Sequence, residues 1–255
     1  MSRGFWRAVL IGTAMAGMAG AGCREADSDV LVSAASSLRV PLEELSRMYA
    51  NRSGDRVVLN TGASSLLARQ IVEGAPVDLF ISADEAQMAT VEHAGKIVPG
   101  TRVELLSNQL AVVAPSDGKA VVNDLNDLTA PTVRRVGMGN PVAVPVGVYS
   151  RQLLEARGLW ERVQPKVVPA GTAEMALAAA EAGHVDAAFV YLTDARRSAR
   201  VKTLLVIGRD EGPHIAYPAA IVPSGGNEPG ARRFLQYLRG TEAKTVFTRY
   251  GFIVS

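Results

Sequence analysis

Two turns rich in small hydroxyl residues each follow a short β-branched run, and both could contribute to an anion site. The first is Ser33-Ala34-Ala35-Ser36-Ser37 after Val30-Leu31-Val32, and the second is Gly62-Ala63-Ser64-Ser65 after Val57-Val58-Leu59. A helical pattern follows each turn, and the first N–H groups of a helix lack intrahelical partners, so a helix start favours negative charge. The two units therefore predict two helix N-termini directed at one oxyanion.

Such donors would suit a doubly negative tetrahedral ion. Serine hydroxyls and backbone N–H groups surround an ion of this kind without supplying a full positive charge. Each hydrogen bond to a charged group contributes roughly 1.5–3 kcal/mol, so a few of them support micromolar or tighter binding after the cost of association. The commoner role of a serine after a strand is to cap the next helix, and that alternative stays open for Ser37 and Ser64.

Catalytic motifs are missing from the sequence. It contains no Gly-x-Ser-x-Gly elbow, no Gly-x-x-x-x-Gly-Lys phosphate loop and no His-Glu-x-x-His metal helix. The histidines are expected at a helix end, a loop and a turn, far apart in the sequence: His93, His184 and His214. Four aspartates fit helix caps or strand ends better than a carboxylate pair: Asp78, Asp84, Asp186 and Asp194. We therefore predict a protein that is not an enzyme and holds no metal directly through its side chains.

The N-terminal residues are predicted to form an export signal. Arg3 and Arg7 precede an apolar run rich in alanine and glycine, from Ala8 to Gly22. This run is short for a membrane span of roughly 20 residues, so residues 1–22 read as a signal peptide. The mature chain is then expected in the periplasm or elsewhere outside the cytoplasm.

Cys23 is the only cysteine, which excludes an internal disulfide. It directly follows Gly20-Ala21-Gly22 and resembles a bacterial lipoprotein processing site. Lipid on Cys23 would hold the protein at a membrane surface, and this would be its only membrane contact. An ordinary signal with an unmodified cysteine stays open as an alternative, because Gly20 stands where such sites usually have leucine.

The charge balance argues against nucleic acid as a partner. Without Arg3 and Arg7 the 27 basic residues fall to 25, which equals the 25 acidic residues. With no basic run and only 5% aromatic residues, the chain offers neither a phosphate-tracking surface nor a base-stacking platform.

Alternating strand-like and helix-like segments predict an α/β fold with two lobes, each a mainly parallel sheet flanked by helices. The first series has strands at 30–32, 57–60 and 77–81 and helices at 38–50, 64–73 and 84–93. The second has strands at 110–114, 133–138, 166–168 and 187–191 and helices near 121–128, up to about 157, and at 172–182. Strands at 203–207 and 216–222 and helices at 228–239 and 241–250 follow. Lobe 1 is thus 28–108 plus 216–255 and lobe 2 is 109–215, with the ligand cleft between them and two crossings that form a hinge.

Six sequence blocks in this order resemble the molybdate-binding proteins of bacterial ABC importers, which are type II periplasmic binding proteins. The resemblance runs from about Val30 to Phe252. The blocks are Ala34-Ala35-Ser36-Ser37-Leu38, Leu67-Ala68-Arg69-Gln70-Ile71 to Ala83-Asp84, Ser107-Asn108-Gln109-Leu110, Val144-Pro145-Val146-Gly147-Val148-Tyr149, Phe189-Val190-Tyr191-Leu192-Thr193-Asp194-Ala195 and Arg249-Tyr250-Gly251-Phe252.

The resemblance implies an oxyanion site on five residues. Ser37 and Ser64 would supply hydroxyl and backbone donors, Val146 and Ala173 backbone N–H groups, and Tyr191 its hydroxyl. Where the family commonly has Asp-Pro before a Pro-Ala-Gly turn, this chain has Asn140-Pro141 and then Pro145-Val146-Gly147. The backbone contact of Val146 survives that change, although the cavity size can differ. Tyr191 as a half-buried packing residue remains the alternative.

The expected function is a monomeric receptor that captures molybdate or tungstate without any cofactor and delivers it to an ABC permease. None of the five positions offers a carboxylate to accept the proton that phosphate carries, and an unpartnered buried donor costs about 1–3 kcal/mol, which disfavours phosphate. Sulfate would be disfavoured by cavity size, and tungstate is too similar to molybdate to be separated. The alternatives are a receptor for another oxyanion such as sulfate, an exported hydrolase that uses Ser64 or Ser37, for which no nearby histidine base is apparent, and a sensor lobe.

Overall fold

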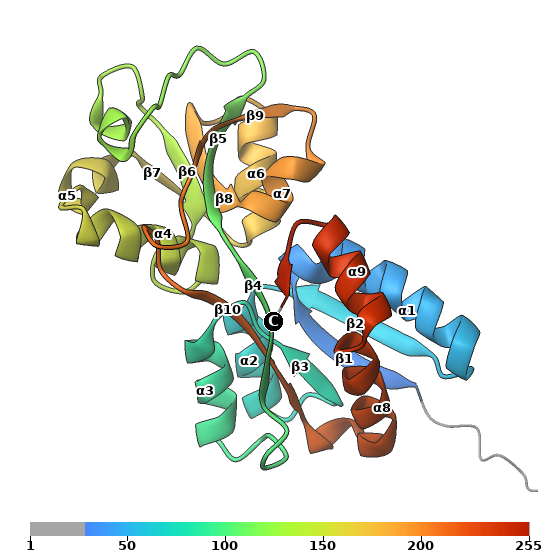
Figure 1. Cartoon of the computed structure of the whole chain (residues 1–255). Helices are drawn as coiled ribbons and strands as arrows, with labels where there is room; N and C mark the ends of the chain where they lie inside the picture. Colours follow the sequence, from blue (N-terminus) through green and yellow to red (C-terminus); the bar gives the residue numbers. More distant parts are fainter. Residues whose placement is uncertain (1–28, 255) are drawn as a thin grey trace, which may run out of the picture.

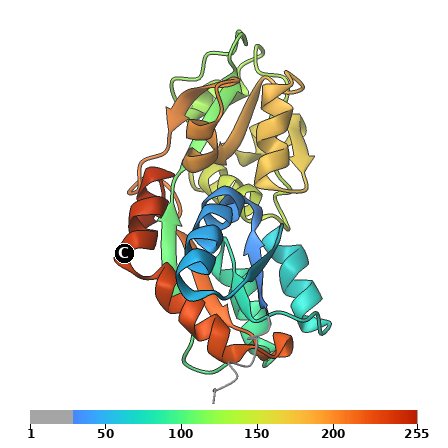
Figure 2. The same cartoon turned by 90° about the vertical axis from the view of Figure 1, so that its right-hand side faces the viewer.

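Two β-sheets form the framework of the chain, one in each of two lobes (Figure 1). The structure is a computed structural model and describes residues 29–254. The predicted signal peptide at 1–22 and the predicted lipid site at Cys23 lie outside the described residues. Figure 2 shows the two lobes one above the other, connected by extended segments.

The first lobe contains a six-stranded sheet in the order β11-β4-β10-β3-β1-β2. Its strands are β1 (Val30–Ala35), β2 (Val57–Gly62), β3 (Leu79–Ile81), β4 (Val103–Asn108), β10 (Ile215–Ile221) and β11 (Ile253–Val254). Its helices are α1 (Arg39–Ser53), which follows a 3-10 turn at Ser36–Leu38, α2 (Ser64–Val72), α3 (Glu85–His93), α8 (Glu228–Leu238) and α9 (Thr241–Arg249), with a further 3-10 turn at Pro223–Gly225.

Alternation along β3 explains how helices cover both faces of this sheet. Leu79 and Ile81 are fully buried in the cluster that includes residues of α1, α8 and α9, whereas Phe80 is buried with residues of α2 and α3. Successive strand side chains point to opposite faces, so one strand contributes to two apolar layers. Figure 1 shows these two helix groups on opposite sides of the sheet. The apolar side chains of α1 and of the turn before it lie in the first layer, with Leu38, Leu42, Leu45 and Tyr49 all buried.

The second lobe contains a five-stranded sheet in the order β7-β6-β8-β5-β9. Its strands are β5 (Leu110–Pro115), β6 (Val136–Gly139), β7 (Val167–Ala170), β8 (Ala187–Tyr191) and β9 (Val201–Val206). Its helices are α4 (Pro145–Ala156), α5 (Trp160–Val163), α6 (Ala173–Glu181) and α7 (Leu192–Arg197), with 3-10 turns at Leu125–Thr129 and Gln164–Lys166.

The predicted two-lobed α/β fold is confirmed, but both sheets are mixed, and the prediction of mainly parallel sheets is wrong. β1 pairs in parallel with β2 and β3, while β4 and β10 pair with their neighbours in antiparallel fashion. The chain passes between the lobes through Gln109, between β4 and β5, and through residues 207–214, between β9 and β10. Because Asn108 and Ile215 are partners in the β4–β10 ladder, the two crossings lie side by side.

One predicted helix, near 121–128, is wrong. This segment contains only the 3-10 turn at Leu125–Thr129, although the apolar side chains of Val122, Leu125 and Leu128 are buried there. Asp124 accepts from Asn126 N at 2.6 Å, and Asp127 accepts from the N–H of Asp124 at 3.3 Å. This capping box closes a single turn in place of a longer helix. Four elements were not predicted: β4, β11, α5 and α7.

Three of the four aspartates accept hydrogen bonds from backbone N–H groups at strand and helix ends, as predicted. Asp78 accepts from Leu31 N at 2.8 Å and from Asn227 N at 2.7 Å. Asp84 caps α3 by accepting from Gln87 N at 2.7 Å. Asp186 accepts from the N–H groups of Arg134 and Arg135, both at 2.8 Å. These carboxylates fix strand and helix ends rather than forming a catalytic pair.

The fourth aspartate, Asp194, lies in α7 with its side chain fully buried. Its ionisation should make the stability of the chain depend on pH. Its nearest cation is Arg197, at 3.4 Å, and neither carboxylate oxygen accepts a hydrogen bond from any described residue. Burial raises the pKa of Asp194 from 3.8 to about 7, with Arg197 lowering it and Glu174 raising it. The folded chain then holds a proton between those values that the unfolded chain releases. The free energy of unfolding should fall as pH rises through this window, by up to about 1.4 kcal/mol per pH unit from this group.

Urea denaturation of the wild type and of Asp194→Asn measures this effect at several pH values between roughly 4 and 8, the range between the ordinary and the raised pKa of Asp194. We expect the variant to give a flatter profile, because its amide does not titrate. Parallel profiles for the two proteins would show that Asp194 ionises normally.

Candidate ligand site between the lobes

A small pocket with a cavity volume of about 10 Å³ lies between the lobes. Pockets for drug-sized organic ligands are usually about 300–1,000 Å³, so this one suits a smaller guest. Residues of both lobes line it: Ala35, Ser36, Ser37, Gly62, Ala63, Ser64 and Ala83 from the first, and Val144, Pro145, Val146, Thr172, Ala173 and Tyr191 from the second. None of these lining residues carries a charged side chain.

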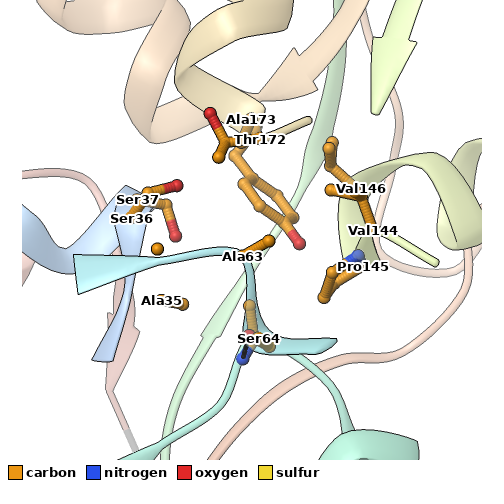
Figure 3. Close-up of a pocket in the computed structure, with 13 residues that line it drawn as sticks. Ala35, Ser36, Ser37, Ala63, Ser64, Val144, Pro145, Val146, Thr172 and Ala173 are labelled. Atoms are coloured by element: carbon orange, nitrogen blue, oxygen red, sulfur yellow. Dashed lines mark hydrogen bonds between the residues drawn. The ribbon is translucent and has the colours of Figure 1, made fainter. Parts of the chain in front are cut away.

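Strand ends and helix starts bring these residues together. Ser36 and Ser37 follow β1, Ser64 opens α2 after β2, and α4 and α6 begin at the opposite wall. Figure 3 shows Ser36 and Ser37 facing Val144–Val146 across the pocket, with Ala63 and Ser64 on one further side and Thr172 and Ala173 on the other. In α/β folds, ligands commonly bind at the carboxyl ends of strands in this way.

Three helices of at least nine residues direct their N-terminal ends at the pocket. The N-cap residues of α2 and α4 are Ala63 and Val144, which provide no side-chain cap. In α6 the Thr172 hydroxyl caps Met175 N at 3.1 Å, two positions beyond Ala173. The first N–H groups of these helices, including those of Val146 and Ala173, have no intrahelical acceptor and give the pocket a positive potential.

Neither predicted serine acts as a helix N-cap. Ser37 lies inside the 3-10 turn, and its Oγ is 3.1 Å from the hydroxyl of Tyr217. Ser64 is the first residue of α2, and its Oγ accepts a 3.0 Å hydrogen bond from Ala83 N. Both side chains are buried, at 2% and 1% exposure. The capping alternative is therefore removed for both residues.

Tyr191 ends β8 with its hydroxyl unpaired. The side chain is 1% exposed, and Oη has no hydrogen-bond partner among residues 29–254. Burial, followed by the nearby hydroxyls of Tyr217 and Tyr149, raises the pKa of Tyr191 well above its ordinary value. The phenol is therefore a neutral donor at physiological pH. An unpaired buried hydroxyl costs about 1–3 kcal/mol, so a ligand that accepts from it would recover this energy.

Glycine at position 147 allows α4 to approach β6. A Cβ on Gly147 would lie 2.0 Å from the carbonyl oxygen of Gly139 and 2.6 Å from that of Asn140. Both neighbours are backbone atoms, which cannot move without displacing the strand end. The Pro145-Val146-Gly147 sequence therefore fixes where the Val146 N–H lies, and the side chain at position 146 is less important for that donor.

One ion pair joins the lobes beside the pocket. The Arg39 guanidinium, at the start of α1, lies 3.1 Å from the Glu174 carboxylate in the first turn of α6. Both side chains are partly exposed, so the pair contributes only a fraction of 1 kcal/mol. Its geometry requires the two lobes to be close together.

All five predicted residues, Ser37, Ser64, Val146, Ala173 and Tyr191, line this pocket. Ser36, which was not among the predicted site residues, lines the pocket as well. Thr172 also lines the pocket and was not predicted, and neither were Asn108 and Tyr217 behind the wall. The histidines lie elsewhere, and no cluster of three or more potential metal ligands occurs in the described part of the chain.

A two-lobed α/β fold with a small pocket between its lobes is the fold of the periplasmic binding proteins. The sequence profile described as "Bacterial extracellular solute-binding protein" matches residues 30–253. The chain is 33% identical to the molybdate-binding protein ModA of Escherichia coli, and the alignment covers 98% of each protein. It is also 33% identical to the putative ABC transporter substrate-binding lipoprotein YvgL of Bacillus subtilis, over 87% of this chain and 85% of that protein.

Among solved structures, the periplasmic molybdate-binding protein of Azotobacter vinelandii superimposes with a TM-score of 0.80. It is 26% identical, and the match covers 89% of this chain and all of that one. The chain therefore belongs to the family of bacterial extracellular solute-binding proteins that includes ModA. This is a family of binding proteins, so the chain is not an enzyme. No helix within residues 29–254 is long and apolar enough to cross a membrane.

Proposed function

We propose that the chain is the receptor of a bacterial ABC importer and that it binds molybdate, and tungstate as well, between its lobes. The observation that carries this proposal is the Tyr191 hydroxyl, a buried donor without a partner, in a pocket that no charged side chain lines. The relatives named molybdate-binding protein support the same ligand.

The proposed ion is held by neutral donors from both lobes. Ser37 and Ser64 donate from the first lobe, and Tyr191 and the N–H groups of Val146 and Ala173 donate from the second. Each hydrogen bond to a charged oxygen contributes roughly 1.5–3 kcal/mol before the cost of association. Because donors on both lobes meet only when the lobes approach, the ion favours the closed arrangement, and an ABC permease would recognise this closed form.

We further propose that lobe 1 comprises residues 28–108 and 216–255 and that lobe 2 comprises residues 109–215, with Ile215 at the boundary already paired to Asn108 in the sheet of the first lobe. Lipid on Cys23, after removal of residues 1–22, would be the only membrane attachment of a monomeric receptor. The similarity to a lipoprotein of Bacillus subtilis supports this arrangement.

A titration of the purified mature chain with four oxyanions tests the function. Molybdate and tungstate should raise the melting temperature in a concentration-dependent manner, because a ligand that binds only the folded state stabilises it by mass action. Sulfate should have little effect because it is smaller, and phosphate because it carries a proton that the site cannot accept. A response to sulfate or phosphate without one to molybdate would replace this proposal by a receptor for those ions.

Replacing Tyr191 by phenylalanine should separate binding from stability. We expect molybdate affinity to fall about ten- to a hundredfold, because one hydrogen bond to a charged oxygen is lost. The ligand-free variant should be at least as stable as the wild type, because the hydroxyl that is removed has no partner there. Calorimetric titration gives the first quantity and urea denaturation the second. Unchanged affinity would mean that Tyr191 only packs.

A further inference from the structure

A buried chain of hydrogen bonds leads from the hinge to Ser37. Asn108, the last residue of β4, donates through Nδ2 to the Tyr217 hydroxyl at 3.2 Å and to the Thr193 hydroxyl at 3.0 Å. The Tyr217 hydroxyl in turn lies 3.1 Å from Ser37 Oγ. None of these four side chains is more than 5% exposed, so water does not compete for the bonds.

The direction of this chain follows from its first member. The backbone N–H of Gln109 donates to Asn108 Oδ1 at 2.8 Å, and only the amide oxygen can accept there. The amide NH₂ group therefore faces Tyr217, whose oxygen is an acceptor. Burial raises the pKa of Tyr217 far above its ordinary value, so its hydroxyl keeps its proton.

Ser37 is the acceptor available to that proton. If Ser37 donated to Tyr217 instead, the tyrosine proton would have no partner in a fully buried place, at a cost of about 1–3 kcal/mol. The favoured arrangement runs from Asn108 through Tyr217 to Ser37, and the Ser37 proton is then free to point into the pocket. Successive bonds of this kind polarise one another and strengthen the last donor.

A hydrogen bond from the backbone orients the Ser64 hydroxyl in the same way. The Ala83 N–H donates to Ser64 Oγ at 3.0 Å, which occupies a lone pair of that oxygen from behind. The Ser64 proton is left for the pocket. Both serines, although chemically able to donate or accept, therefore present hydrogen to a ligand.

We propose that Asn108 and Tyr217 are positioning residues that hold the Ser37 hydroxyl as a donor, and that this makes the pocket select fully deprotonated tetrahedral oxyanions. The proposal rests on the proposed function. In a pocket lined by no carboxylate, the serine oxygens are side-chain acceptors that a ligand proton could use. Directing their protons inward makes both serines donors toward the ion, so an ion that carries an O–H group meets donors at these two positions where it needs an acceptor.

Sulfate and phosphate provide the test because they are nearly equal in size. At pH 8 both ions are mainly dianions, but only the phosphate ion carries a proton. Their affinities are measured by competition against bound molybdate in the wild type and in Tyr217→Phe. We expect the variant to bind molybdate several-fold more weakly and to raise the phosphate-to-sulfate affinity ratio about tenfold, because Ser37 becomes free to accept.

One control variant and one second test variant complete the experiment. Tyr49→Phe removes another buried tyrosine hydroxyl, bonded to Asp55 at 3.0 Å in the first lobe, and should leave the ratio unchanged. Asn108→Asp keeps the side-chain shape but turns the donor into an acceptor, so the Tyr217 proton would turn away from Ser37. This variant should raise the ratio as well, which keeps the proposal testable if Tyr217→Phe does not fold.

The outcomes are distinguishable. A wild-type chain that binds molybdate, together with folded variants whose phosphate-to-sulfate ratio equals the wild-type ratio, would overturn the positioning role alone. Weaker molybdate binding at an unchanged ratio would reduce Tyr217 to a packing role and also overturn it. A wild-type chain that binds none of these ions would overturn the proposed function and this inference with it.

Discussion

Simultaneous replacement of Ser37 and Ser64 by alanine is expected to weaken molybdate binding by at least about a hundredfold. Two hydrogen bonds to a charged oxygen are lost, and each contributes roughly 1.5–3 kcal/mol. The backbone N–H groups and the Tyr191 hydroxyl remain, so some affinity should persist. Calorimetric titration of the double variant and of each single variant measures the effect.

Stability gives a second readout for the same variants. Each replacement also removes a buried hydrogen bond, the one between Ser37 and the Tyr217 hydroxyl or the one that Ser64 accepts from Ala83 N, so the ligand-free double variant should melt at a lower temperature. Ser65→Ala, a neighbouring serine that does not line the pocket, is the matched control and should leave affinity unchanged. A double variant with wild-type affinity would show that the serines serve only the fold.

The replacement Gly147→Ala is expected to impair both folding and binding. The added methyl group would lie 2.0 Å from the Gly139 carbonyl oxygen, so α4 has to shift away from β6. Overpacking of this kind costs about 1–3 kcal/mol or more, and the shift moves the Val146 N–H away from the ion. We expect a lower melting temperature and molybdate affinity reduced at least about tenfold.

Gly171→Ala is the control for this second variant. It lies in the turn before α6, and its added methyl group would meet only the flexible end of Met175, at 3.3 Å. Both melting temperature and affinity should remain near the wild-type values. If Gly147→Ala behaved in the same way, the close approach of α4 and β6 would not be what fixes the Val146 donor.

Local signals in the sequence predicted much of the site. The serine turns at Ser37 and Ser64 lie next to strongly apolar strands, and short-range rules for helix starts were enough to direct them at an anion. Val146, Ala173 and Tyr191 came from the resemblance to a known family, since a backbone donor leaves no trace in residue type. The structure brings all five to one pocket.

Long-range contacts and elements with a weak apolar pattern could not be predicted from the sequence. Tyr217 meets Ser37 across 180 residues and Asn108 across 109, and no local pattern encodes such a pairing. The strand β4 begins with half-exposed and exposed residues at Val103 and Glu104, which weakens its apolar signal. The error near 121–128 arose because capping by Asp124 and Asp127 overrides a weak helical pattern.

The positions of Arg39 and Glu174 could report by fluorescence whether the two lobes are open or closed. These two exposed side chains come within 3.1 Å of each other from different lobes, so any opening has to separate them. Environment-sensitive dyes on cysteines placed at these positions, with Cys23 replaced, would change emission whenever the halves part. The chain would then act as a sensor for trace metal oxyanions in water.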